Sequence, residues 1–272
     1  MTSRGRIDPR AHYGALAQGA QRHDELLALL TRLLPLRGQW GEPMPMWLDN
    51  LYDSVPQREI YEHLAPKITG GGVVLQMGGT GKEALKALIG GAGRAVHVTP
   101  VPQEAALTLR LADELGVAHS LTVVLGTGEA LPIASASIDA YISERCLHHT
   151  DVAQALREAR RVLRPGGRFA AADPWHARLH DFARATVDRQ RPGLSCTPLD
   201  ERRLADLASV FPESQVRLHG ALVRYPVIAL LRLGVPLTRP VIEWLTDYDD
   251  RISSRFAVLR RNGSAAAVLA TV

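Results

Sequence analysis

The chain has 272 residues, of which 46% are apolar and 22% charged, so it can bury the core of one large domain. Its net charge is only +4, and 5% of its residues are aromatic, which argues against a surface that stacks nucleic-acid bases. The longest apolar stretch, YPVIALLRLGVPL at 225–237, contains an arginine and two prolines and is too short to span a bilayer. Cys146 and Cys196 make no disulfide framework, which favours a reducing compartment. We therefore expect a cytoplasmic protein that binds neither nucleic acid nor membrane.

Apolar residues at helical spacing mark the N-terminal quarter. Leucines recur at this spacing over 23–36, and residues 45–68 read as one or two short amphipathic helices broken near Pro56. We expect residues 1–68 to form a helical lid or arm, or the surface of a homodimer.

From residue 69 the pattern changes to short buried strands that alternate with helices. Strands are predicted at 72–77, 95–99, 121–126, 138–144 and 168–173, and helices at 82–90, 102–116 and 151–163. This alternation builds βαβ units with a parallel sheet, whose ligands lie beyond the carboxyl ends of the strands.

The C-terminal third is less regular. The pattern predicts a helix at 199–211, a strand at 214–223, interrupted helices at about 225–261 and a last strand at 264–272. We therefore expect one α/β domain over 69–272, with residues 225–261 as a helical insertion that covers the site.

The stretch VVLQMGGTGK (73–82) places a glycine-rich turn between the first strand and its helix. Glycines allow positive φ and close approach of a ligand, and the helix start offers free N–H groups. A Walker loop is excluded, because it needs glycine at Gln76 and a hydroxyl at Glu83. The dinucleotide fingerprint fits only in part, because the second strand ends at Thr99 instead of an acidic residue.

Three stretches together carry a family resemblance: VVLQMGGTG (73–81), EALPIASASIDAYISERCLHH (129–149) and REARRVLRPGGRFAAADP (157–174). They resemble the class I S-adenosylmethionine-dependent methyltransferases of the type 11 group over roughly residues 70–175. The resemblance implies a Rossmann-like, seven-stranded, mostly parallel sheet with N-terminal helices and a C-terminal helical cover. It also implies methyl transfer from S-adenosylmethionine to a small molecule, for example in secondary metabolism.

The resemblance assigns cofactor contacts to matching positions, but three positions that are usually acidic in the family are neutral here: Gln76, Thr99 and Thr127. The glycine turn would take the aminoacyl end, Thr99 would lie near the ribose and Thr127 near the adenine. Glu129 or Glu104 could supply a missing acceptor. The cofactor residues implied are Gln76, Gly78, Gly79, Gly81, Thr99, Thr127 and Glu129.

Histidines follow the fourth and fifth strands. His148 and His149 are the candidate general bases, since imidazole titrates near neutral pH. With His176 and His180 they would form a cluster that suits a divalent metal, although we do not make a metal the leading expectation. Two alternatives stay open: a cyclase, lyase or metal-assisted enzyme on the same fold, or a non-catalytic binding subunit.

Overall fold

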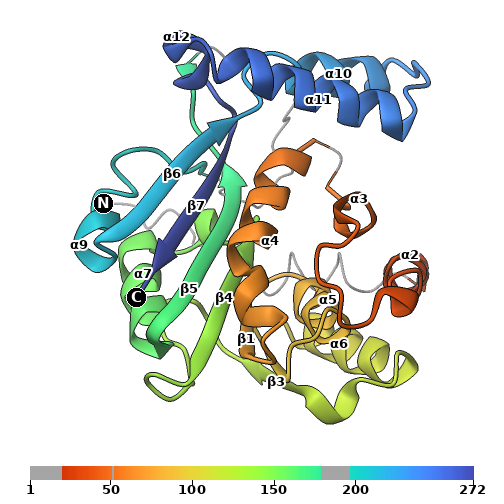
Figure 1. Ribbon diagram of the computed structural model, residues 1–272, viewed down its shortest axis with the longest axis vertical. Coiled ribbons are helices and arrows are strands. Elements are labelled where there is room, and N and C mark those ends of the chain that lie inside the picture. The colour runs from red at the N-terminus through yellow and green to blue at the C-terminus, as the bar shows by residue number, and fades with distance from the viewer. Residues whose placement is uncertain (1–19, 51, 179–196) are drawn as a thin grey trace, which may run out of the picture.

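The strands of the protein form one seven-stranded sheet in the order β3-β2-β1-β4-β5-β7-β6 (Figure 1). A computed structural model describes residues 20–50, 52–178 and 197–272. All strands run parallel except β7, which is antiparallel to both β5 and β6. The predicted mostly parallel sheet is therefore confirmed. The strands are β1 (Val73–Met77), β2 (Arg94–Thr99), β3 (Leu121–Leu125), β4 (Ile138–Glu144), β5 (Leu163–Pro174), β6 (Glu213–His219) and β7 (Ala265–Thr271).

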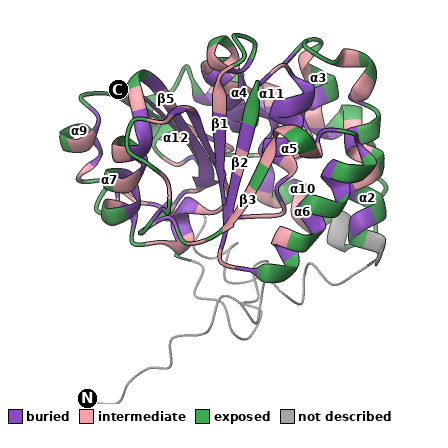
Figure 2. Ribbon diagram, turned by 90° about the horizontal axis from the view of Figure 1, so that it is seen from below, coloured by how far each residue is buried: buried purple, intermediate pink, exposed green. Residues whose placement is uncertain are grey.

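Helices cover both faces of the sheet, and Figure 2 shows the buried strands between them. Adjacent residues of a strand point to opposite faces, so Val74 of β1 packs among helices α4 and α5 whereas Leu75 packs with α7. The helices are α2 (Ala20–Thr31), α3 (Met44–Trp47), α4 (Ser54–Ile68), α5 (Lys82–Ile89), α6 (Pro102–Glu114), α7 (Val152–Val162), α9 (Leu207–Val210), α10 (Arg224–Arg232), α11 (Arg239–Ser253) and α12 (Ala257–Arg260). Over the described ranges, none of these helices has the length and apolar content needed to cross a membrane.

The N-terminal segment joins the main core through α4. Its residues Ile60, Tyr61 and Leu64 are fully buried against the sheet. The break expected near Pro56 lies earlier, between the end of α3 at Trp47 and the start of α4 at Ser54. Pro56 sits in the first turn of α4, where its missing N–H costs no helical bond. The division of the chain at residue 68 stays a prediction.

Helices α10, α11 and α12 lie across the end of the sheet toward which β5 and β6 point (Figure 1). One carboxylate oxygen of Asp249 in α11 accepts hydrogen bonds from the backbone N–H groups of Leu222 and Val223, both at 2.9 Å. Arg224 is 2.7 Å from Asp53, just before α4. These contacts tie the expected C-terminal helical cover to the N-terminal segment.

The helix expected over 199–211 is wrong for most of its length, because only Leu207–Val210 is α-helical and residues 201–206 form turns. Asp200 accepts a hydrogen bond from the backbone of Arg203 at 2.8 Å. The guanidinium of Arg203 in turn binds the carbonyls of His148 and Thr150 at 3.0 Å each. A tertiary contact therefore replaces the local helical pattern.

His219 at the end of β6 joins three elements. Its ring nitrogens lie 2.6 Å from Asp250 of α11 and 3.0 Å from Glu59 of α4. Burial alone would lower the pKa of His219, but the hydrogen bonds to Asp250 and Glu59 raise this pKa to about 9. The histidine is therefore protonated at neutral pH and links the helical cover to the sheet.

Replacement of His219 by glutamine tests this link. The pKa of the ring is raised on folding, so its stabilising contribution is complete below about pH 6.5 and is lost as the pH rises through about 9. We expect the difference in free energy of unfolding between wild type and His219→Gln to shrink by roughly 2–3 kcal/mol from pH 6 to pH 9.5. Chemical denaturation over this range measures it. The control is His119→Gln, at an exposed position. A difference independent of pH would contradict the charged link.

Candidate active site

The turn after β1 has the backbone that its glycines predict. Gly78, Gly79 and Gly81 have φ of 74°, 69° and 73°, which favours glycine at each position. At Gly81 a β-carbon would also lie 2.3 Å from the side chain of Thr108 in α6. The turn therefore needs glycine both for its backbone and for its packing.

Gln76 braces this turn from inside the protein. Its side-chain nitrogen donates to the carbonyl of Gly78 and its oxygen accepts from the backbone N–H of Ala84, both at 2.8 Å. The residue is 4% exposed. Gln76 thus bonds to both ends of the turn, and its direct contact with a cofactor stays a prediction.

His97 of β2 supports the same turn. One ring nitrogen is 3.1 Å from the carbonyl of Gly79 and the other 3.0 Å from the hydroxyl of Thr108. Burial lowers the pKa of His97 to about 4, so the ring is neutral at neutral pH. Gln76 and His97 therefore hold the turn through hydrogen bonds between uncharged groups. Neither side chain places a charge against the backbone of the turn.

A buried cluster of charges lies at the start of α5. The ammonium of Lys82 is 2.5 Å from Asp49 and 3.2 Å from both Glu83 and Glu144. Lys86, one helical turn later, is 2.5 Å from Asp49 and 3.4 Å from Glu83. Asp49 belongs to the segment between α3 and α4, so the cluster joins the N-terminal segment to the first helix after the glycine turn.

Neutral hydrogen-bonding groups surround this cluster. The hydroxyl of Tyr61 donates to Glu83 and lies 2.7 Å from the ammonium of Lys86. The side-chain nitrogen of Gln57 is 2.7 Å from Asp49 and 3.2 Å from Glu144. Because these groups satisfy the buried charges, the cluster can be stable away from water.

The cluster balances its own charge. Burial would raise the pKa of Asp49, but the ammonium groups of Lys86 and Lys82 hold it well below its usual range. Burial raises the pKa of Glu144 to about 8 in spite of Lys82, with Glu83 adding to the rise. At neutral pH two carboxylates therefore face two ammonium groups, and Glu144 is protonated.

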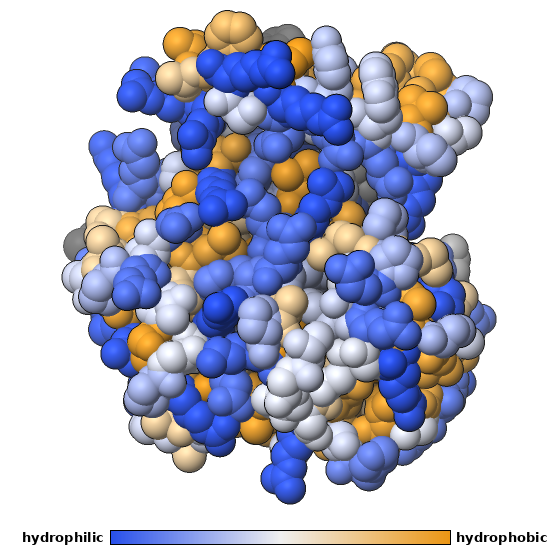
Figure 3. Space-filling model, viewed as in Figure 1, coloured by the Kyte–Doolittle hydropathy of each residue, from blue (hydrophilic) through white to orange (hydrophobic). Residues whose placement is uncertain are grey.

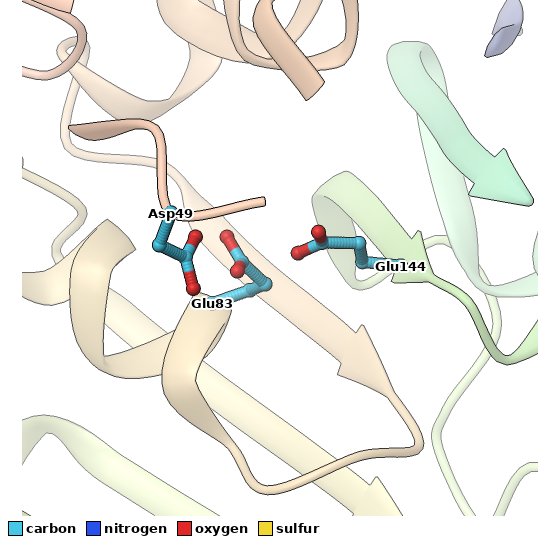
Figure 4. A group of neighbouring side chains, drawn as sticks. All are labelled: Asp49, Glu83 and Glu144. Atoms are coloured by element: carbon cyan, nitrogen blue, oxygen red, sulfur yellow. The ribbon is translucent and has the colours of Figure 1, made fainter. Parts of the chain in front are cut away.

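Asp49, Glu83 and Glu144 each offer an oxygen within 4.8 Å of the others, and Figure 4 shows their carboxyl groups facing one another. Across residues 20–50, 52–178 and 197–272, no other group of three or more histidine, cysteine or acidic residues has such spacing. The two lysines already supply positive charge here, so the geometry favours an internal salt-bridge cluster.

At the tip of β2, Thr99 is paired with an acidic residue from the next helix. Its hydroxyl donates to Glu104 of α6 at 2.6 Å and accepts from the N–H of Val101 at 3.2 Å. Burial raises the pKa of Glu104 to about 7, although the Thr99 bond and Arg22 lower it. A carboxyl group is therefore present at this tip although the strand itself ends in threonine.

Two further residues that the sequence assigned to the cofactor lie beyond β3. Thr127 is exposed and forms an isolated bridge with Ala130. Glu129 accepts a hydrogen bond at 3.0 Å from the N–H of Asp151, the N-cap of α7. Both residues follow the carboxyl end of β3, and their contact with a cofactor stays a prediction.

The candidate bases lie between β4 and α7. His148 is 4% exposed, and its Nδ1 is 2.5 Å from Asp173 at the end of β5. The same oxygen of Asp173 accepts from the backbone N–H of His148 at 3.1 Å. The ring centroids of His148 and His149 are 3.9 Å apart. An aspartate thus orients one of the two candidate bases.

The wider histidine group is only partly described. His176 follows β5, and its backbone N–H binds the carbonyl of Leu199 at 2.8 Å. His180 lies outside the described residues. The grouping of four histidines around a metal therefore stays a prediction.

Sequence reasoning missed the charge cluster, although one signal was present. The chain has 32 lysines and arginines, yet Lys67, Lys82 and Lys86 are its only lysines. Two of them stand four residues apart at the start of one helix and so share a face. Asp49 carried no such signal, because nothing in the local pattern places it beside a helix more than 30 residues away.

Comparison with known proteins gives partial matches. Residues 75–171 match a family model described as "Methyltransferase domain". A malonyl-[acyl-carrier protein] O-methyltransferase of Dechloromonas aromatica (strain RCB) is 43% identical over 90 residues, which cover 32% of this chain and 34% of the relative. A dimethylglycine N-methyltransferase of Parasynechococcus marenigrum (strain WH8102) is 32% identical over 148 residues, 54% of this chain and 49% of that protein. The chain thus spans about a third to a half of these relatives.

Solved structures share the fold. The YcgJ protein of Bacillus subtilis has a TM-score of 0.52 and 21% identity, with 78% of this chain and 98% of that chain covered. A geranyl diphosphate C-methyltransferase of Streptomyces coelicolor A3(2), in complex with Mg²⁺, geranyl diphosphate and S-adenosyl-L-homocysteine, has a TM-score of 0.51 and 14% identity over 81% of each chain. At these identities the likeness concerns the fold alone.

The variant Gln76→Glu tests the brace of the glycine turn. The change keeps the shape but replaces the donor that faces the carbonyl of Gly78 with an acceptor. We expect the free energy of unfolding at pH 7 to fall by about 1–3 kcal/mol, the cost of an unsatisfied buried polar pair. Urea denaturation measures it. Gln103→Glu, at an exposed position in the first turn of α6, serves as the control. Equal stabilities of the two variants would show that the brace contributes nothing.

Proposed function

Because this chain belongs to the class I S-adenosylmethionine-dependent methyltransferase family, we propose that it transfers a methyl group from S-adenosylmethionine to a small-molecule acceptor. The observation that carries the proposal is the braced glycine turn at the head of α5, whose three glycines keep the left-handed backbone that a cofactor's aminoacyl group needs for close approach. The proposal for the acceptor draws on relatives named for small substrates, dimethylglycine and geranyl diphosphate. A role in secondary metabolism and a homodimer stay predictions.

The residues at the tip of β2 fit the ribose of this cofactor. A ribose diol donates hydrogen bonds to a carboxylate, and Glu104 provides a carboxyl group that Thr99 already positions. We propose that Glu104, and not Thr99 itself, is the main acceptor. Thr127 and Glu129 then lie in the loop assigned to the adenine.

The proton of the acceptor needs a base in the same cleft. In methyl transfer the nucleophilic atom of the acceptor bonds to the methyl carbon, the carbon–sulfur bond breaks and its electrons stay on sulfur. The cofactor supplies the electrophilic methyl group. His148 would take the proton of the acceptor, because the Asp173 carboxylate at Nδ1 orients the ring and stabilises the imidazolium that forms. Arg203 holds the carbonyls on either side of His149 and so fixes this turn.

Calorimetry with S-adenosylmethionine and S-adenosylhomocysteine tests the cofactor assignment. Glu104 can accept both ribose hydroxyls with its two oxygens only when ionised, and burial raises its pKa to about 7, so wild-type affinity should rise by up to about tenfold from pH 6 to pH 8. Glu104→Gln should bind about 10–100-fold more weakly at pH 8, since a hydrogen bond to a charged acceptor contributes about 1.5–3 kcal/mol. The same variant should lose the pH dependence.

Asp113→Asn, at an exposed position of the same helix, is the matched control and should bind like wild type. Equal binding by Glu104→Gln and wild type at pH 8 would contradict the ribose assignment. A wild-type protein that binds neither compound at millimolar concentration would remove the methyltransferase proposal. Binding without formation of S-adenosylhomocysteine across a panel of acceptors would favour the non-catalytic subunit.

A further inference from the structure

A cavity of about 290 Å³ lies beside the charge cluster, between α2, the segment after α3 and the start of α11. Its wall includes Lys82, the residue that follows the glycine turn. Figure 3 shows the right-hand edge of the surface indented between the α10–α11 layer above and the α2–α3 region below. The cavity therefore adjoins the turn to which the cofactor is assigned.

Cationic side chains dominate this wall. Arg22, Arg32, Arg239 and Lys82 line it against two carboxylates, Glu25 and Asp49. Asp49 is already shared by the two ammonium groups of the charge cluster. Lys82 is balanced within that cluster and Arg239 pairs with Glu243, so Glu25 is the lining carboxylate left to face the charges of Arg22 and Arg32.

Two of the arginines converge on the same stretch of backbone. Arg32, directly after α2, donates to the carbonyl of Met46 at 3.5 Å, and Arg239 of α11 donates to the carbonyl of Leu48. Burial and the neighbouring charge of Arg239 lower the pKa of Arg32, although Asp49 raises it. The carboxylate of Glu243 already lies 2.7 Å from Arg239, and a bound anion would further reduce the repulsion between the two guanidinium groups.

The remaining wall is apolar. Leu26 and Leu29 of α2 face the same cavity. A volume of about 290 Å³ is near the lower end of ordinary ligand sites, so it suits a small group. The wall thus combines paired guanidinium groups with a short apolar surface.

We propose that this cavity binds an anionic group of the methyl acceptor, a carboxylate or a phosphate, between Arg32 and Arg239, with the adjoining carbon chain against Leu26 and Leu29. The proposal rests on the proposed function for the identity of the ligand as acceptor. It makes the substrate a small organic acid or phosphate ester. Lys82 separates this anion site from the glycine turn, so the two ligands would lie side by side.

Anion binding can be measured without any cofactor. We would titrate wild type, Arg32→Gln, Arg239→Gln and the double variant with inorganic diphosphate and with succinate by calorimetry. The wild type should bind at least one of them, and the double variant should bind it at least tenfold more weakly. Diphosphate and succinate separate a phosphate ester from a carboxylate as the natural group. The control is Arg251→Gln, at an exposed position in the last turn of α11.

The same variants are then titrated with S-adenosylmethionine. Unchanged cofactor affinity in the double variant, together with lost anion affinity, supports the acceptor site. A parallel loss of cofactor affinity would overturn it, because the arginines would then hold the carboxylate of the cofactor itself. Wild type that binds neither anion would also overturn it. Failure of the wild type to bind the cofactor would count against the proposed function alone, since the anion titration does not depend on it.

Discussion

The ammonium groups of Lys82 and Lys86 lie buried against the carboxylate of Asp49, and this contact holds the N-terminal segment beside the glycine turn. Buried charges must be matched, because removal of one partner of such a pair costs about 3–5 kcal/mol. Glu83 carries the second negative charge, and Glu144 is protonated at neutral pH, so the cluster is balanced. The residues of this contact, Asp49 and Lys82, also form part of the wall of the arginine-lined cavity. The position of both candidate ligand sites therefore depends on this neutralisation.

The proposed cofactor end of the site would rely on different residues from those that the family resemblance implies. Where an acidic residue is expected at 76, Gln76 turns inward and fixes the glycine turn by neutral hydrogen bonds. Where one is expected at the tip of β2, Thr99 instead positions Glu104 from the following helix. Burial of the Glu104 carboxyl group raises its pKa to about 7. The proposed function therefore carries a pH sensitivity that depends on Glu104.

Local sequence patterns predicted the strands of the sheet. They failed where contacts with residues distant in sequence determine the backbone conformation. Short apolar runs such as 73–77 and 265–271 are typical of strands with both faces covered, and both are strands of the sheet. Residues 199–206 have a helical pattern, but Arg203 is drawn to carbonyls near residue 148 and the segment forms turns. For the site, the sequence identified the glycine turn and the His148–His149 pair as candidates. The sequence placed Asp173 at the same sheet edge as these histidines, and only the structure shows that Asp173 orients His148.

The sequence by itself determined the order of the strands and most helices along the chain, because this order follows from the spacing of apolar residues. It also determined the place of the glycine turn, because of the backbone freedom of glycine. Only the tertiary structure decided which charges meet. Asp49 and Lys82 are 33 residues apart, and Arg32, which follows α2, and Arg239, which begins α11, come from distant parts of the chain. These contacts depend on how the helices pack over the end of the sheet. A local sequence pattern cannot specify them, because the residues become neighbours only when the core is packed.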